Sequence, residues 1–231
     1  MIIILMFGSA LALFASVMFI NHRLTRIIGA LLFSLLFIGS TALMGLNYSQ
    51  HFGMKKVTTT NSQTVYSAAG KLPVALYQPI GTSGQDNVLI YKTKQGQKKP
   101  DHTQANEYTT SKMQFTNRTT PLLKSTETRW QFKNDFYKVL FMWSGMNGTL
   151  IKRTNVIEYP RTFVKLTPSQ AHQLQKKIGN AGPQLQSQAK SFVTSRVQSA
   201  MANQPNMSAQ QIQQVSQQAE QEFMAKMIRQ N

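Results

Sequence analysis

The chain has 231 residues and a formal net charge of +17, because 25 Lys and Arg residues stand against 8 Asp and Glu residues. It contains no cysteine, which excludes disulfides, thiolate metal sites and an acyl-cysteine lipid anchor. The basic excess makes polyanions the expected class of ligand.

Two uncharged apolar runs open the chain, over residues 2–20 and 27–46. About twenty helical residues rise about 30 Å, the hydrocarbon thickness of a bilayer, so each run is long enough to span it. A buried helix pair in a soluble protein and a cleaved signal peptide are the alternatives, but the first run lacks a basic start and a small-residue cleavage site. We therefore expect residues 1–46 to form a transmembrane hairpin that stays in the mature protein.

The connector between the two runs, residues 21–26, contains Arg23 and Arg26. Lys55 and Lys56 follow the second run by about eight residues, so the count of cations on the two sides nearly ties. Because a tight connector places both arginines at the membrane interface, we predict that it stays cytoplasmic. Both termini and the C-terminal region would then lie outside.

The two spans should pack against each other. Gly8, Ala12 and Ser16 recur every fourth residue of the first run and predict a smooth stripe for close helix contact. Small residues are also common in any transmembrane helix, and the two interpretations have equal weight. Neither run contains a charged residue, so a proton relay or ion pathway is not expected.

Residues 47–63 are rich in Thr, Ser, Asn and Gln and predict a polar tether. Residues 64–166 predict a small antiparallel β domain, in which residues 74–77 and 87–93 are the first strand-like segments. The fold class is thus an α+β membrane protein.

The clearest local pattern in this domain is a hairpin. Residues 128–133 and 136–143 flank Asn134-Asp135, a pair that suits a two-residue turn. The register places Phe132 opposite Tyr137. A third strand is expected from Leu150 to Tyr159.

The C-terminal region, residues 167–231, is rich in glutamine and predicts helices. Thr167-Pro168-Ser169-Gln170 combines a capping residue, proline at the first helical position and glutamine three residues after the cap. Residues 203–206 predict a break between two amphipathic helices. These helices are expected to cover the sheet or pair with each other, and a protruding hairpin that binds a partner helix is the alternative.

Catalytic and metal-binding motifs are missing from the sequence. The four histidines occur in no metal-binding spacing, and no phosphate loop, dinucleotide-binding turn or nucleophile elbow is present. Asp101-His102 is the one adjacent acid and imidazole, and its basic surroundings favour a solvated loop. No catalytic residue, cofactor or metal is therefore expected.

Lysines form the strongest remaining feature. Lys92, Lys94, Lys98 and Lys99 are predicted on a loop between strands, while Lys55 and Lys56 are expected near the membrane. These lysines are candidates for contact with anionic lipid or an anionic wall polymer. The alternative is that they only increase solubility.

The chain resembles an uncharacterised membrane-protein family of lactic-acid bacteria, which is a domain of unknown function. The features that carry the resemblance are the two-span hairpin, the segment Leu76–Gly84, the strand Val88–Lys92 and the aromatic segment from Thr128 to Gly145. The resemblance implies a bacterial cell membrane and brings no activity, cofactor or catalytic residue.

Three functions are open at this point. The favoured one is a non-enzymatic envelope component whose outer domain contacts a protein or an anionic polymer or lipid; nucleic acid is not an expected partner. The second is an accessory subunit of a larger membrane transporter or synthase. The third is an enzyme that acts on the cell wall through an unidentified site.

Overall fold

A computed structural model describes residues 1–231 except 71, 82–85 and 231. The chain divides into two compact units. The first comprises residues 1–59 and 127–153, and the second comprises residues 60–126 and 154–231.

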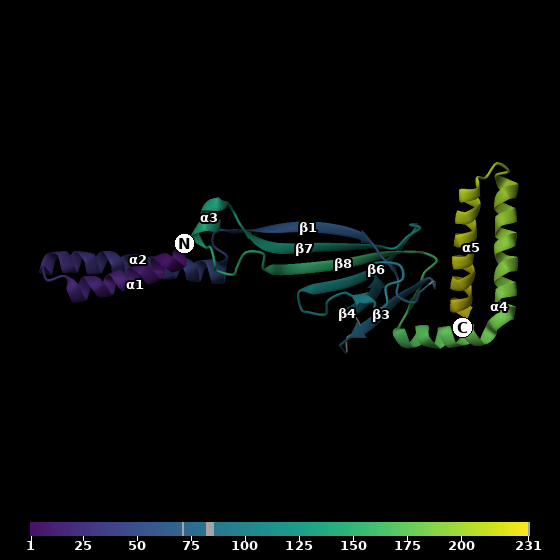
Figure 1. Ribbon diagram of the computed structural model, residues 1–231, viewed down its shortest axis with the longest axis horizontal. Helices are drawn as coiled ribbons and strands as arrows, with labels where there is room; N and C mark the ends of the chain where they lie inside the picture. Colours follow the sequence, from purple (N-terminus) through teal and green to yellow (C-terminus); the bar gives the residue numbers. More distant parts are fainter. Residues whose placement is uncertain (71, 82–85, 231) are drawn as a thin grey trace. The chain divides into compact units, whose positions relative to one another are not determined.

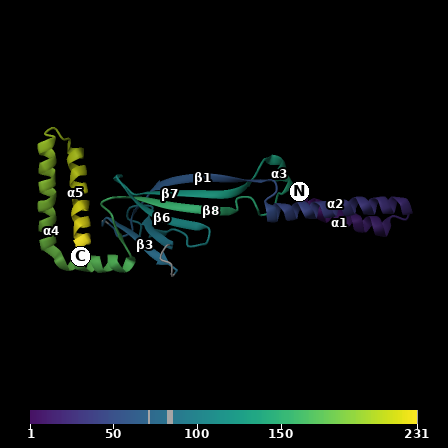
Figure 2. The ribbon, with the colours of Figure 1, turned by 180° about the vertical axis from the view of Figure 1, so that it is seen from behind.

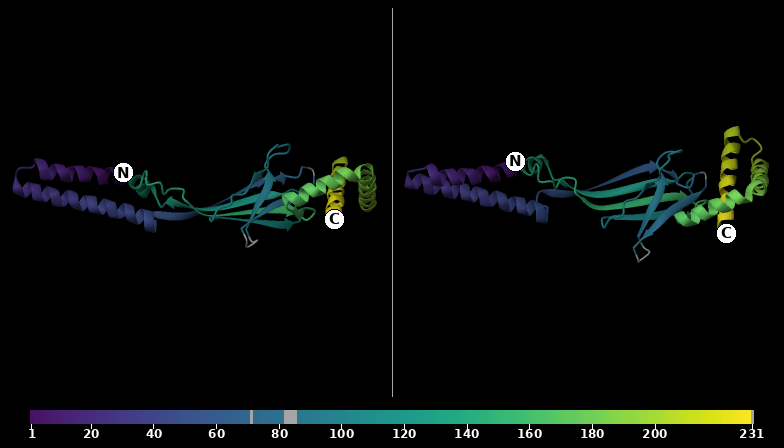
Figure 3. Two further views of the ribbon diagram at one scale, coloured as in Figure 1. Left: turned by 90° about the horizontal axis from the view of Figure 1, so that it is seen from below. Right: turned by 60° about the horizontal axis from the view of Figure 1, so that its bottom comes forward.

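The first unit begins with two apolar helices, α1 (Ile2–Phe19) and α2 (Arg23–Gln50). They lie side by side, joined by only three residues (Figures 1 and 2), and two further views agree (Figure 3). The prediction of two long apolar helices is confirmed. The predicted six-residue connector is wrong, because Arg23 and Arg26 already belong to the first turn of α2.

The buried residues of these helices recur every seven positions and mark the seam between them. Ile2, Ser9 and Ser16 are the buried residues of α1, and Ser40 and Asn47 are those of α2. A seven-residue spacing is typical of the shallow crossing found in helix pairs and coiled coils.

The predicted stripe is therefore correct only in part. Ser16 donates a hydrogen bond to the Arg26 carbonyl at 3.3 Å, and a Cβ added to Gly29 would lie 2.4 Å from Ser16 Oγ. Ala12 is half-buried. Gly8 is exposed, and a Cβ added to it would meet nothing within 4 Å, so Gly8 is not part of the seam.

The predicted polar tether is wrong, because most of it is a strand. Residues 47–50 complete α2, and β1 (Met54–Thr64) follows after a turn at Gly53. Gly53 has φ +78°, and a Cβ on it would lie 2.4 Å from Tyr137 Cδ1. Glycine is thus required at this turn for two reasons, its backbone conformation and the aromatic ring beside it.

The first sheet has the strand order β1, β7 (Leu122–Phe132), β8 (Leu150–Pro160) and β6 (Thr109–Thr116). Hydroxyl pairs join Thr58 to Thr128 and Thr60 to Thr126, which makes β1 antiparallel to β7. The predicted strand after the glycine turn is confirmed as β8.

The second half of the predicted hairpin is wrong. Residues 135–140 form a short helix, α3 (Asp135–Leu140), and not a strand. Asn134 caps it, because its side-chain oxygen accepts a hydrogen bond from the Tyr137 backbone nitrogen at 3.1 Å. The Asn-Asp pair therefore begins a helix where the sequence predicted a two-residue turn.

The second sheet, within the second unit, has the order β2 (Tyr66–Ser67), β4 (Asp86–Lys92), β3 (Val74–Ile80) and β9 (Val164–Leu166), and β5 (Asp101–His102) pairs with β4. The strands predicted over 74–77 and 87–93 are confirmed as β3 and β4. The purely antiparallel expectation is wrong, because β3 and β9 are parallel and the sheet is mixed. The end of the segment Leu76–Gly84, residues 82–84, lies outside the described residues.

Two apolar clusters hold the second unit together. The first is built around Leu89, Ile157 and Tyr159, and the second packs α4 (Pro168–Asn203) and the end of α5 (Ala209–Gln230) on strand residues such as Val74. Buried apolar surface of this kind contributes roughly 25 cal/mol per Å². The helices thus complete the core of this unit.

The C-terminal helices follow the sequence prediction closely. Thr167 and Gln170 form the expected capping box, and α4 ends at Asn203, before the predicted break. Figure 1 shows α4 turning sharply and then running beside α5. The turn falls at Gly182, whose φ of 36° is non-helical.

Candidate functional site

Side-chain hydrogen bonds shape the predicted basic loop. The Gln97 side-chain oxygen accepts hydrogen bonds from the backbone nitrogens of Thr93 and Lys94, at 3.0 and 3.3 Å. Its amide nitrogen donates to Asp101 at 3.0 Å. Gly96, with φ +80°, completes the turn. The loop is therefore a defined structure that presents its cations from a fixed backbone.

Three of the four predicted loop lysines share this place. Lys94, Lys98 and Lys99 are exposed, and no acidic side chain forms a salt bridge with them in the part of the chain that the structure describes. Lys92 is half-buried in β4 and opposite Tyr66, so its assignment to the loop was wrong. We call Lys94, Lys98 and Lys99 the cationic loop.

Lys55 and Lys56 lie on β1 and belong to the first unit, whereas the cationic loop belongs to the second. Lys55 is exposed. The Lys56 Nζ lies 5.3 Å from the centroid of the Trp130 ring, and His51 stacks on the same ring at 4.1 Å. The Lys56 ammonium group thus makes a cation–π contact with an aromatic ring of its own chain.

An open hollow in the second unit adds further cations. It is lined by Phe115, Arg161, Phe163, Val164 and Lys165. Lys165 Nζ lies 4.1 Å from the centroid of the Tyr77 ring. A lining of two cations and apolar side chains suits an anionic group.

Several carboxylates are engaged by cations. Glu127 accepts hydrogen bonds from Arg129 Nε at 2.7 Å and from Arg153 Nε at 2.6 Å. The hydrogen bond from Arg129 is the main cause that holds the pKa of Glu127 below its ordinary value, and the bond from Arg153 adds to it. Glu158 is paired with Lys124. Both acids thus have structural partners.

Among the described residues, no three His, Asp or Glu side chains gather as a metal ion would need. His102 Nδ1 lies 3.1 Å from the Thr103 carbonyl oxygen, and Asp101 bonds Thr93 and Gln97. The Asp101-His102 pair thus has local backbone and loop partners.

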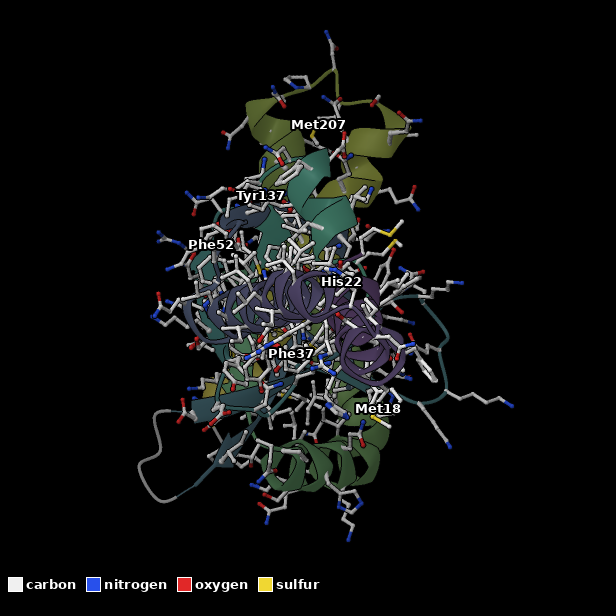
Figure 4. The ribbon with its side chains drawn as sticks, turned by 90° about the vertical axis from the view of Figure 1, so that its left-hand side faces the viewer. Met18, His22, Phe37, Phe52, Tyr137 and Met207 are labelled. Carbon is white, nitrogen blue, oxygen red and sulfur yellow. The ribbon has the colours of Figure 1, made fainter. Side chains whose placement is uncertain are left out.

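The first unit contains an aromatic cluster where α2 ends. Phe52 contacts Tyr137 edge-on at 5.7 Å, and Tyr137 and Phe132 each stack on Phe141 at 6.3 Å. Figure 4 labels Phe52 and Tyr137 in this cluster. Phe141 is completely buried. The cluster fixes α3 to the end of α2.

Sequence reasoning missed α3, the arginines on Glu127 and the hollow. A signal for α3 was present: Phe136, Val139 and Trp143 follow helical spacing, and Asn134 is a good cap. Arg129 is two residues from Glu127 on the same strand, so this pair was open to a local pattern. Arg153 is distant from Glu127 in the sequence, as Phe115 is from the rest of the hollow, so no local pattern indicates these contacts.

No curated protein and no solved structure matches the chain. The family described as Domain of unknown function (DUF4811) matches residues 21–174, which is more than half of the chain. The chain belongs to this family.

Proposed function

We propose that the protein is a two-span component of the bacterial cell membrane, without enzymatic activity, whose extracytoplasmic region binds an anionic polymer or lipid through the cationic loop. The observation that carries the proposal is the exposure of the apolar helices. Only 17% of the most apolar window of α1 and 6% of that of α2 are buried. In water, each large apolar side chain left exposed forgoes roughly 1.5–3 kcal/mol of burial.

A soluble protein would cover such helices with its own chain. Here Leu11, Leu35 and Phe19 are 70%, 72% and 75% exposed. Lipid tails are the solvent that suits this surface, and backbone hydrogen bonds within each helix are already satisfied. By length and by composition, the two helices are also long and apolar enough to cross a membrane.

The arginines support the direction of insertion. Arg23 and Arg26 lie at the N-terminus of α2, where the helix dipole is positive and disfavours cations. Their position therefore does not stabilise the helix. It does suit the rule that short cytoplasmic connections are rich in Lys and Arg.

The cationic loop supports the choice of ligand. Three exposed lysines on a defined backbone attract phosphates, and the Arg161 and Lys165 hollow of the same unit is suited to an anion. Lysines near an anionic surface gain about 1 kcal/mol each, and salt reduces this gain.

The test uses the full chain in phosphatidylcholine nanodiscs, titrated with a soluble, fluorescent poly(glycerol phosphate). The variant K94Q/K98Q/K99Q should weaken binding about 10- to 100-fold at low salt and reduce the slope of log affinity against log salt by about 2–3. The matched control K176Q/K177Q/K190Q removes the same charge from exposed positions of α4.

Equal weakening in both triple variants would contradict a specific role of the cationic loop and indicate only net charge. Binding that does not change with salt in the wild type would contradict an electrostatic origin.

A second candidate is an accessory subunit that docks on a larger membrane transporter or synthase. It is favoured by the α4 and α5 pair, where Phe192 contacts Phe223 at 5.6 Å while Met201 remains 42% exposed. A photo-crosslinking residue at Met201 should then yield, in living cells, an adduct with a transporter or synthase subunit. An adduct only between copies of this chain would count against it.

A further inference from the structure

The short helix α3 is apolar on two faces. Its inner side chains, Tyr137 and Phe141, pack in the aromatic cluster at the end of α2. Its outer side chains are Phe136, Val139 and, just past the helix, Trp143, which are 68%, 50% and 66% exposed. Asp135 and Lys138 are the polar residues of α3. Large apolar side chains that lie exposed next to one another mark a surface that contacts protein or lipid.

Contacts within the first unit place α3 at one end of the apolar helices. The Met1 nitrogen lies 2.9 Å from the Val139 carbonyl oxygen and 3.2 Å from that of Leu140. Lys133, just before α3, donates its backbone N–H to the Gly53 carbonyl, after the end of α2. α3 therefore lies beside the start of α1 and the residues that follow α2, at the end of the helix pair away from the connector.

The chemistry of this face matches one environment. Trp and Tyr concentrate where hydrocarbon meets headgroups, and interfacial helices combine large apolar residues with lysines. Lys133 and Lys138 are exposed beside the apolar face, and Tyr48 is exposed near the end of α2. The apolar surface of α3 thus adjoins that of the two long helices, and its lysines complement anionic headgroups.

The backbone at Trp143 adds an independent observation. Trp143 has φ 71°, which is unusual for a bulky residue and costs free energy. Trp143 is also 66% exposed. Such a placement in water would bring no compensating contact, whereas an indole at a lipid interface gains both apolar and hydrogen-bonding partners.

We propose that α3 is an interfacial membrane element: Phe136, Val139 and Trp143 enter the boundary between headgroups and acyl chains and hold the start of the soluble region against the bilayer. The inference rests on the proposed membrane insertion of α1 and α2. It adds a third membrane contact that follows them by more than eighty residues in the sequence.

The chain contains only two tryptophans, which makes a direct test possible. The full-length variant W130F keeps Trp143 alone, and W143F keeps Trp130, which is stacked on His51 and lies under Lys56. Both are reconstituted in phosphatidylcholine vesicles whose acyl chains carry bromine either near the headgroup or near the methyl end.

Trp143 emission should be quenched by bromine near the headgroup at least about twofold more than by bromine near the methyl end, and at least about twofold more than Trp130 emission. Trp143 emission at a water-like wavelength, with quenching no stronger than for Trp130, would overturn the inference. The inference would also be overturned if energy transfer from Trp143 or crosslinking between chains increased with the ratio of protein to lipid. Such an increase would mean that a second copy of the chain covers this face.

A second variant tests the neighbouring side chains. Adding F136S/V139S to W130F should shift Trp143 emission to the red and reduce its quenching at least about twofold. The control adds M201S to W130F instead, which replaces an exposed apolar residue of α4. It should leave the Trp143 emission wavelength and its quenching unchanged.

Flotation with the vesicles after carbonate extraction separates the two proposals. If the chain does not float, the membrane proposal itself fails. If it floats and Trp143 remains in water, only the role of α3 is contradicted.

Discussion

The Tyr159 hydroxyl lies in the core of the second unit and has no hydrogen-bond partner among the described residues. Its ring is completely buried and packs on Phe163 at 5.3 Å. Burial raises the pKa of this phenol, so it stays neutral at every physiological pH. The ring stabilises the core, whereas the hydroxyl carries a desolvation cost.

We predict that Tyr159→Phe raises the free energy of unfolding by about 1 kcal/mol, because it removes the unpaired hydroxyl and keeps the ring. Tyr159→Ala should lower it by about 3–5 kcal/mol through the cavity that it leaves. Urea denaturation of the full chain in a mild non-ionic detergent measures both. A destabilising Phe variant would mean that the hydroxyl has a partner.

Glu127 shows the opposite case, a half-buried group with charged partners on both oxygens. Because its pKa is lowered in the folded state by Arg129 and then Arg153, ionised Glu127 stabilises the fold. This contribution is complete above the ordinary value of 4.5 and is lost as the pH falls through the lower folded-state pKa. Stability should therefore fall on acidification.

We predict that Glu127→Gln lowers the free energy of unfolding at neutral pH by about 1–2 kcal/mol, after allowance for partial exposure of the group. The difference from wild type should shrink below pH 4.5, measured by urea denaturation across a pH series. The control is Glu222→Gln, whose pairing with Arg196 is more exposed and should contribute less than about 0.5 kcal/mol. Equal effects of the two substitutions would contradict a special role of the paired arginines.

At the scale of elements, local patterns predicted what local interactions decide. The apolar runs predicted α1 and α2, and Thr167 to Gln170 predicted the start of α4, because apolar composition and a capping box act within a few residues. The break after Asn203 was equally local. These elements need little from the rest of the chain.

Elements that depend on distant partners were mispredicted. β1 is an edge strand of its sheet, and its sequence shows no alternation of apolar and polar residues. The hydroxyls of Thr58 and Thr60 form hydrogen bonds with threonine hydroxyls of the distant strand β7. The all-apolar run after Phe136 fits a strand or a helix, and the decision for α3 comes from the Asn134 cap and from Phe52 packing on Tyr137. Pattern alone cannot choose between the two.

The same division holds for the candidate sites. Lys94, Lys98 and Lys99 are neighbours in the sequence and could be predicted as a cluster. The hollow joins Phe115 of β6 to Lys165 of β9, and only the fold brings them together. Lys92 lies in β4 and not in the loop, whereas the role of Lys56, whose Nζ lies over the Trp130 ring, stays a prediction.

At the scale of the whole molecule, membrane orientation decides which partners can reach the cationic loop. The cations on the two sides of the anchor nearly balance, with Arg23 and Arg26 at one end and Lys55 and Lys56 after the other. In the proposed topology, the arginines lie closest to the membrane boundary, because they are at the start of α2. This proximity favours a cytoplasmic connector and an outside C-terminal region.

The absence of cysteine makes this orientation directly measurable. We predict that a single cysteine at Ser187, an exposed position of α4, reacts with a membrane-impermeant maleimide on intact cells. A cysteine at Asn21, in the connector, should react only after the membrane is opened. Lysed cells, in which both must react, are the control, and labelling of Asn21→Cys on intact cells would reverse the topology.

The arginines can be tested in the same background. Because Lys55 and Lys56 would then carry most of the positive charge next to the anchor, R23Q/R26Q should make the Asn21 cysteine reactive in a large fraction of intact cells. K55Q/K56Q removes the same charge on the other side and should leave Asn21→Cys protected. If both pairs leave the labelling unchanged, the orientation is set by the folding of the C-terminal region and not by these cations.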